Sequence, residues 1–157
     1  MTQVIRYKPL ALICVALLVT GCAYDNNKSP YSAAVGSKAA QYATHMVGAR
    51  YRFGGNNPKS GFDCSGLVQY SYAKAGARVA RDTRGQKKTS RAISVKQLQK
   101  GDLLFFHQQG KRYSHVGIYV GNNQFVHAPS SGKRVSKDTL GRYWRKHLAS
   151  TRRFRSL

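Results

Sequence analysis

The first regular alternation of apolar and polar positions along the chain lies in residues 37–49. Its apolar residues recur at intervals of three and four positions, the spacing of one face of an α-helix. They are Ala39, Ala40, Ala43, Met46 and Val47. Ser37 is the expected N-cap and Gly48 lies near the expected end. The pattern therefore predicts one amphipathic helix.

A second helix is predicted after a turn-rich segment, residues 51–58. It opens with Asp-Cys-Ser-Gly at residues 63–66 and ends before Gly76. Its apolar face consists of Leu67, Val68, Tyr72 and Ala75. Residues 78–96 have no clear periodicity and many basic residues. They are expected to form a surface excursion that could border a substrate cleft.

The later part of the chain changes to the patterns of β-strands. Strands are predicted at residues 103–106, 115–120 and 124–128. A helix near residues 138–147 and a last strand near residues 151–154 complete the expected elements. No internal repeat is visible, and a length of 157 residues suits a single hydrophobic core.

The N-terminal residues have the pattern of an export signal. Arg6 and Lys8 precede an apolar run, residues 10–19, which is followed by Thr20, Gly21 and Cys22. A run of about ten apolar residues is roughly half the length that a membrane-crossing helix requires. We therefore assign residues 1–21 to a signal peptide, the polar residues 22–35 to a flexible tether, and residues 36–157 to one folded domain.

The segment Val19-Thr20-Gly21-Cys22 resembles the lipobox of bacterial lipoproteins. This resemblance implies cleavage before Cys22 and attachment of acyl chains to its sulfur and to the new amino terminus. Ala23 stands where an Asp would favour the inner membrane, which implies an outer-membrane anchor facing the periplasm. The alternative is an ordinary signal peptide with an incidental cysteine.

The cysteine inventory singles out Cys64. Cys14 leaves with the predicted signal and Cys22 is predicted to be acylated, so Cys64 is the one free thiol of the mature chain. Exported domains either pair their cysteines in disulfides or use them chemically. Cys64 is therefore a candidate nucleophile.

The charge is strongly basic. Of the 27 Lys and Arg residues, Arg6 and Lys8 leave with the predicted signal, so 25 basic residues face 5 acidic ones. Such a field attracts polyanions. An exported chain meets anionic lipids and carboxylate-rich cell-wall polymers, and we expect no nucleic-acid partner.

The setting of Cys64 at the start of a predicted helix indicates chemistry. Unpaired backbone N–H groups and the helix dipole stabilise a thiolate at that position. Gly66 costs about 1 kcal/mol in helix propensity, which predicts a close approach of another backbone segment. Asp63 is an expected helix cap.

Two histidines lie on predicted strands joined around residues 121–123. A three-residue loop would pair Val120 with Gln124, place Gly117 opposite His127, and put His115 diagonally from His127 on the same face. The opposite face would then collect Val116, Ile118, Val126 and Ala128. A two-residue turn at Asn122-Asn123 would separate the imidazoles, so hydrophobic patterning favours the first register. His115 is then the expected base for Cys64, and His127 the residue that orients it.

Five segments in order resemble the NlpC-type family of bacterial cell-wall cysteine peptidases. They are residues 51–55 (YRFGG), 61–68 (GFDCSGLV), 101–106 (GDLLFF), 114–119 (SHVGIY) and 125–128 (FVHA). The resemblance implies a papain-like α+β fold, with the Cys helix packed on an antiparallel sheet that carries the histidines. Ala80 departs from the family's usual Pro before Arg81, in the segment that could border the cleft.

The resemblance also implies function. The family's catalytic residues fall on Cys64, His115 and His127, and its oxyanion-stabilising tyrosine falls on Tyr51. Asp63 and Ser65 could hold a polar group of the substrate peptide. The implied reaction is hydrolysis of an amide in the peptidoglycan peptide, next to diaminopimelate, through a thioester on Cys64, with no cofactor and no metal.

Alternative functions remain at this stage. Cys64 and the two histidines are acceptable zinc ligands, although the short ligand spacings of common zinc sites are missing. Related papain-like folds include acyltransferases, and a lipoprotein that only binds the wall is a third alternative. We expect a monomer.

Overall fold

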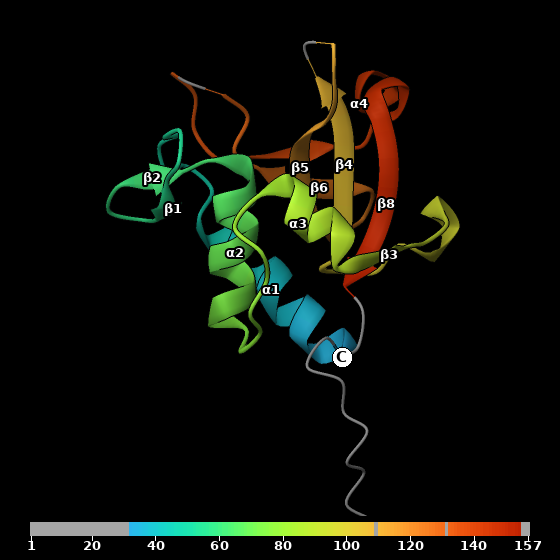
Figure 1. The fold of residues 1–157 in the computed structure, drawn as a ribbon, viewed down its shortest axis with the longest axis horizontal. Coiled ribbons are helices and arrows are strands. Elements are labelled where there is room, and N and C mark those ends of the chain that lie inside the picture. Colours follow the sequence, from blue (N-terminus) through green and yellow to red (C-terminus); the bar gives the residue numbers. More distant parts are fainter. Residues whose placement is uncertain (1–31, 109, 131, 155–157) are drawn as a thin grey trace, which may run out of the picture.

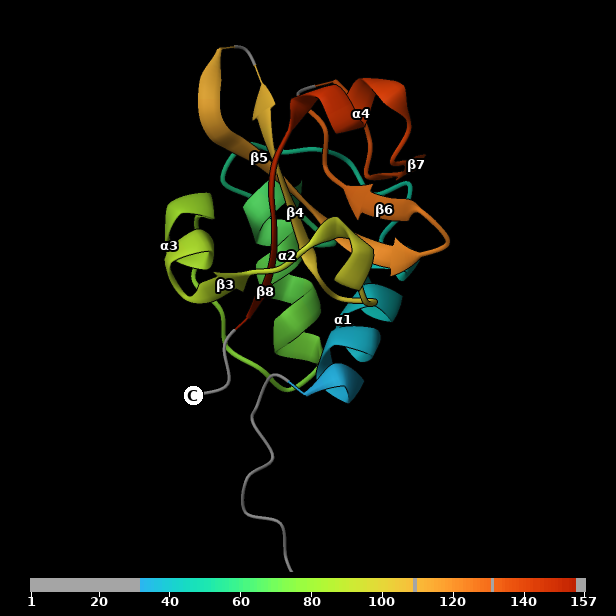
Figure 2. The same ribbon diagram turned by 90° about the vertical axis from the view of Figure 1, so that its right-hand side faces the viewer.

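The computed structural model describes residues 32–108, 110–130 and 132–154. The predicted signal peptide, Cys22 and most of the predicted tether lie outside these residues. The described chain begins with two helices, α1 (Ala33–His45) and α2 (Cys64–Lys74), and continues into a six-stranded sheet. Figures 1 and 2 show both helices packed side by side on one face of the sheet. No helix within the described ranges is long and apolar enough to cross a membrane.

The sheet is antiparallel, with the strand order β3-β8-β4-β5-β6-β7. Its strands are β3 (Ser90–Ala92), β4 (Leu103–Gln108), β5 (Lys111–Gly121), β6 (Gln124–His127), β7 (Ser136–Thr139) and β8 (Leu148–Phe154). The shorter elements are β1 (Asn56–Asn57), β2 (Gly61–Phe62), α3 (Thr83–Lys88), η1 (Val95–Gln97) and α4 (Arg142–His147). This arrangement confirms the predicted α+β fold.

Helix α1 begins earlier than the sequence pattern predicts. Ser32 is the N-cap, and its hydroxyl accepts a hydrogen bond from the N–H of Val35 at 3.3 Å. Gly36, the expected start of the domain, lies inside the helix, and its missing Cβ lets α1 approach the backbone of Lys100 and Gly101 closely. The predicted tether therefore overlaps the helix at residues 33–35.

Helix α2 follows the prediction closely. The carboxylate of Asp63 caps it and accepts a hydrogen bond from the N–H of Gly66 at 2.6 Å. Gly76, with φ of +91°, lies just past its end. A Cβ on Gly66 would lie 2.0 Å from the carbonyl oxygen of Gly55, which confirms the predicted close approach of another backbone segment.

Residues 78–96 are more ordered than the predicted surface excursion. They form α3, β3 and η1. Gln86 and Ser90 are fully buried, and the Gln86 side-chain amide donates hydrogen bonds to the carbonyl oxygens of Ser65 and Ala80. The buried positions of this segment are therefore occupied by polar side chains, so its helix and strand have no hydrophobic periodicity from which they could be predicted.

The two faces of the sheet bury different clusters. Against α1 and α2 lie Leu103, Phe105, Val116, Ile118 and Val126. On the other face, Leu104, Phe106, Phe125 and Leu140 pack with Trp144 of α4. The predicted helix over residues 138–147 is correct only from Arg142 onward, because Asp138 lies on β7, paired with Phe125 of β6.

The β5–β6 hairpin has the two-residue turn, and a bulge beside it gives the strand register that the three-residue loop predicts. Gly121 pairs with Gln124 around a two-residue turn, in which Asn122 and Asn123 have positive φ angles of 51° and 56°. The predicted three-residue loop is therefore wrong. A register shift between Tyr119 and Gly121 restores the pairing of Ile118 with Val126. His115 and His127 consequently share a face, as predicted.

Candidate active site

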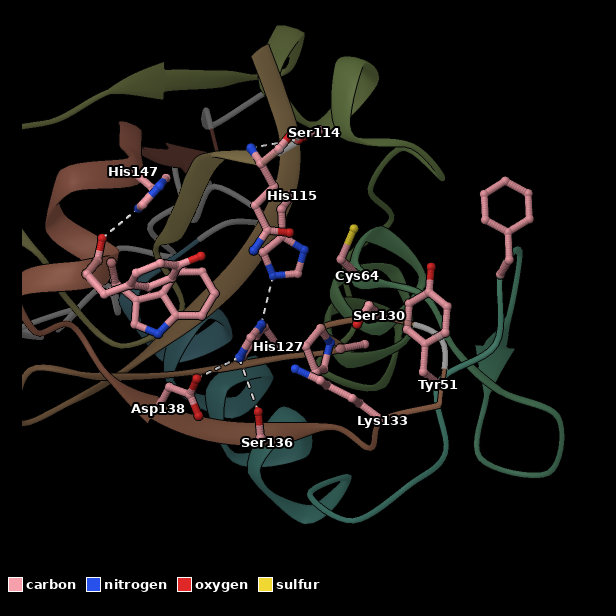
Figure 3. A pocket seen from close by; sticks show the side chains of 16 residues that line it. Tyr51, Cys64, Ser114, His115, His127, Ser130, Lys133, Ser136, Asp138 and His147 are labelled. Atoms are coloured by element: carbon pink, nitrogen blue, oxygen red, sulfur yellow. Dashed lines mark hydrogen bonds and ion pairs between the residues drawn. The ribbon is translucent and has the colours of Figure 1, made fainter. Parts of the chain in front are cut away.

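A cleft of about 970 Å³ opens between the start of α2 and the sheet (Figure 3). Its lining includes all four predicted catalytic residues: Cys64 from α2, His115 and His127 from the strands, and Tyr51 from the loop that precedes β1. The lining residues are Tyr51, Phe53, Cys64, Gln108, Ser114, His115, His127, Ala128, Pro129, Ser130, Lys133, Ser136, Asp138, Tyr143, Trp144 and His147. Residues 78–96, expected at the border, contribute none of them.

Cys64 is the first residue of α2, and its thiol lies against the backbone of β5. The N–H groups of Val116, Ser65 and Cys64 hydrogen bond the sulfur and lower its pKa, but burial has the larger effect and the pKa of Cys64 is raised. The nearby Asp63 carboxylate raises it further. The N–H groups at the start of the helix therefore act on the sulfur as the sequence predicts, but burial outweighs them and favours the protonated thiol.

The two histidines form a buried pair. The Nε2 atom of His115 lies 2.7 Å from Nδ1 of His127, and the residues are only 3% and 1% exposed. Figure 3 shows the imidazole of His115 between His127 and Cys64, with its Nδ1 edge toward the cysteine. The structure thus places His127 where it can orient His115, as the sequence predicted.

Asp138 continues the series of hydrogen-bonded side chains that begins with His115 and His127. The sequence did not predict this role. Its carboxylate lies 3.1 Å from Nε2 of His127, and the hydroxyl of Ser136 lies 3.1 Å from the same nitrogen. Both residues belong to β7, in a register that pairs His127 with Ser136. One signal was available: Asp138 is the only acidic residue that follows the two histidines in the chain.

The hydrogen-bond partners determine where the ring protons lie. A carboxylate accepts hydrogen bonds, so Nε2 of His127 carries the proton toward Asp138. Nδ1 of His127 is then an acceptor and receives the Nε2–H of His115. The Nδ1 of His115 is consequently unprotonated on the side that faces Cys64. The series places a base beside the thiol.

Burial keeps both imidazoles neutral. It lowers the pKa of His115 to about 3, with a further contribution from the neighbouring His127. Burial also lowers the pKa of His127, although the charge and hydrogen bond of Asp138 act in the opposite direction. Burial therefore favours a neutral thiol beside a neutral base.

Tyr51 lies across the cleft from the histidines. Its backbone N–H donates to the carbonyl oxygen of Lys133 at 2.9 Å, which fixes the loop before β1 against the loop after β6. The pKa of the Tyr51 hydroxyl is raised, first by burial and then by the negative charges of Cys64, when it is ionised, and of Asp63. The hydroxyl stays protonated and can donate a hydrogen bond within the cleft.

Asp63 and Ser65 lie beside the cleft and not in its lining. Arg81 donates to both Asp63 carboxylate oxygens, at 3.0 and 2.7 Å, and to the Ser65 hydroxyl at 3.1 Å. Ser65 is 6% exposed and itself donates to Asp63. These bonds hold the first turn of α2 in place, and direct contact of Asp63 or Ser65 with substrate stays a prediction.

Trp144 is a further residue that the sequence did not single out. Its ring packs edge-on against His127 at a centroid distance of 4.9 Å and stacks with His115 at 6.1 Å. It covers the face of the sheet that carries the imidazoles. Trp144 thereby shields the pair from water.

Comparisons with known proteins agree with this geometry. Residues 48–153 match the NlpC/P60 family. The murein DD-endopeptidase MepS/murein LD-carboxypeptidase of Escherichia coli K12 is 34% identical over 180 residues, covering 96% of this chain and 94% of that protein. The bifunctional muramidase/DL-endopeptidase CwlT of Bacillus subtilis is 46% identical over 110 residues, covering 69% of this chain but only 33% of CwlT.

A solved structure shares the fold. The crystal structure of a protein similar to lipoprotein, of the NLP/P60 family from Staphylococcus aureus, aligns with a TM-score of 0.68 and 38% identity. The alignment covers 76% of this chain and 41% of that one. Because the family match spans most of the folded domain and the similarity to MepS extends over nearly the whole chain, this protein belongs to the NlpC/P60 family.

Proposed function

We propose that the chain is an exported, lipid-anchored peptidoglycan endopeptidase with Cys64 as its nucleophile. The names of its relatives, murein DD-endopeptidase and DL-endopeptidase among them, support this class of activity. One structural observation carries the proposal. Cys64 faces the unprotonated nitrogen of His115 at the end of a series that continues through His127 to Asp138, inside a cleft.

The reaction starts from the neutral pair. The sulfur of Cys64 attacks the carbonyl carbon of the substrate amide, and its proton passes to Nδ1 of His115. The raised pKa of the thiol and the lowered pKa of His115 both favour the neutral pair before the attack. His127 and Asp138 stabilise the imidazolium that forms.

The attack converts the carbonyl oxygen into an oxyanion. The backbone N–H of Cys64 and the protonated hydroxyl of Tyr51 are the donors available on that side of the cleft. Collapse of the tetrahedral intermediate breaks the C–N bond, and His115 returns its proton to the leaving amine. The acyl group stays on Cys64 as a thioester. A water molecule, deprotonated by His115, then releases the acid and restores the thiol.

The scissile bond is proposed to lie next to diaminopimelate in the wall peptide. Acylated Cys22 would anchor the protein, as a monomer, in the outer membrane facing the periplasm. The sequence between Cys22 and Ser32 would reach at most about 35 Å, enough to let the domain move between membrane and wall. The basic surface suits a carboxylate-rich substrate.

Two alternatives lead to different products. An acyltransferase would pass the acyl group from Cys64 to an amine or alcohol in place of water, and a wall-binding lipoprotein would form no product. The ordered series from Cys64 to Asp138 favours catalysis over binding alone. For the zinc hydrolase considered from the sequence, no three His, Cys, Asp or Glu side chains of the described ranges are grouped to hold a metal.

Replacing the nucleophile tests the cysteine mechanism. With Cys64→Ala, release of peptides from purified peptidoglycan is expected to fall at least about 10³-fold, because no thioester can form. The products are identified by mass spectrometry. Cys22→Ala, made without the signal peptide, is the matched control and is expected to retain wild-type release. Equal release by wild type and Cys64→Ala would contradict the mechanism, and no release by either would favour the wall-binding alternative.

Asp138→Asn tests the role of the residue that the sequence missed. The amide can donate to Nε2 of His127 and reverse the tautomers of both imidazoles, which would leave His115 without a base toward Cys64. We expect kcat to fall by about 10²- to 10⁴-fold. Asp82→Asn, in the cap of α3, makes the same chemical change away from the cleft and should keep the wild-type kcat. A wild-type kcat in Asp138→Asn would show that the carboxylate is dispensable.

Lipid attachment is tested on the protein isolated from bacterial cells. The mature wild type is expected to begin at Cys22, to carry the added mass of acyl chains, and to fractionate with the outer membrane. The Cys22→Ser variant should lack this mass. A mature wild-type protein without added lipid would rule out the anchor and leave the peptidase activity unaffected.

A further inference from the structure

Lys133 lines the cleft, and the catalytic mechanism does not use its side chain. It lies in the loop between β6 and β7, where its N–H donates to the carbonyl oxygen of Ser130 at 3.2 Å and its own carbonyl oxygen accepts from Tyr51 at 2.9 Å. The loop is thus held to the segment that supplies the oxyanion donor. Figure 3 shows the Lys133 side chain extending into the cleft toward His127.

The charge of Lys133 is uncompensated within the described part of the chain. The described ion pairs join Arg81 to Asp63, Arg153 to Asp102, and His127 to Asp138. The remaining described acid, Asp82, caps α3. The cleft lining contains one lysine, Lys133, and one acidic residue, Asp138. The carboxylate of Asp138 is already hydrogen bonded to His127.

The ammonium group also acts on the catalytic pair. Lys133 is among the groups that lower the pKa of His127, so its charge lies close to that imidazole. A carboxylate bound at Lys133 would therefore sit beside the reacting centre. It would also offset a positive charge that opposes formation of the imidazolium during attack.

We propose that Lys133 is a substrate-binding residue that forms an ion pair with a free carboxylate of the wall peptide beside the scissile amide. This inference rests on the proposed function. Diaminopimelate and D-glutamate both offer free carboxylates in such a peptide, whereas their amidated forms offer a neutral group of the same shape. The exposed aromatic residues of the lining, Phe53 and Tyr143, carry no charge with which to distinguish acid from amide.

The test compares matched peptides. Three synthetic stem peptides are used: one with both carboxylates free, one amidated at diaminopimelate, and one amidated at D-glutamate. An ion pair in a partly open cleft predicts that the wild type cleaves the free acid about tenfold better, in kcat/KM, than one of the amidated forms. The difference should appear mainly in KM and shrink at high salt.

Two variants test whether Lys133 causes the preference for the free acid over the amidated peptide. Lys133→Met is expected to bring the acid-to-amide ratio close to one. Lys137→Met removes an exposed lysine of β7 that does not line the cleft, and it should retain the ratio of the wild type. A preference that persists in Lys133→Met, or that is absent from the wild type, would overturn the proposal.

A binding measurement separates this inference from the proposed function. Calorimetry with Cys64→Ala and the same three peptides needs no turnover. The same tenfold ratio should appear in Kd and vanish in the Cys64→Ala, Lys133→Met double variant. If the wild type cleaves none of the peptides, the peptidase proposal fails, and the Kd ratio alone then decides whether Lys133 binds a carboxylate.

Discussion

The hydrogen bond between His115 and His127 is the interaction on which the rest of the site depends. It is 2.7 Å long and joins two almost fully buried rings, each of which can donate or accept. Asp138 decides which nitrogen of each ring carries the proton. Its carboxylate accepts a hydrogen bond from Nε2 of His127, so Nδ1 of His127 accepts the one from His115. A residue on the edge strand β7 thereby determines which side of a distant imidazole is basic. Trp144 and Phe106 pack against this pair and help to exclude water from it. The resulting burial favours neutral imidazoles.

The fold brings the thiol to this pair from the opposite face of the sheet. Adjacent residues of a strand point to opposite faces, so Val116 packs under the helices while His115 points away from them. Cys64 reaches the backbone of Val116 from the start of α2 and thus flanks His115. The close contact of Gly66 with Gly55 and the cap at Asp63 hold that turn of the helix in place. Catalytic geometry therefore depends on the packing of α2 as much as on the sheet.

The elements that bury a regular pattern of apolar side chains were predicted from the sequence. Those whose buried side chains are polar were missed. Hydrophobic patterning predicted helix α2, strands β4, β5, β6 and β8, and the shared face of the two histidines, although the turn between β5 and β6 was predicted wrongly. Gln86 and Ser90 are buried without such a pattern, so α3 and β3 were missed. Asp138 was assigned to a helix because its partner, His127, is close only across a strand pair. The sequence predicted the N–H groups that lower the pKa of Cys64 but not the burial that raises it, because burial of a side chain depends on the packing of the whole fold.

Nitrogen NMR of the free protein, with ¹⁵N-labelled histidine, tests the central claim most directly. The hydrogen-bond series predicts that His115 and His127 are both neutral at pH 7, each with its proton on Nε2. Because burial lowers the pKa of His115 to about 3, its Nδ1 should stay unprotonated as the pH falls to 5, whereas an unperturbed histidine would take up a proton near pH 6.5. A proton on Nδ1 of His115 at pH 7, in either a neutral or a charged ring, would contradict the account.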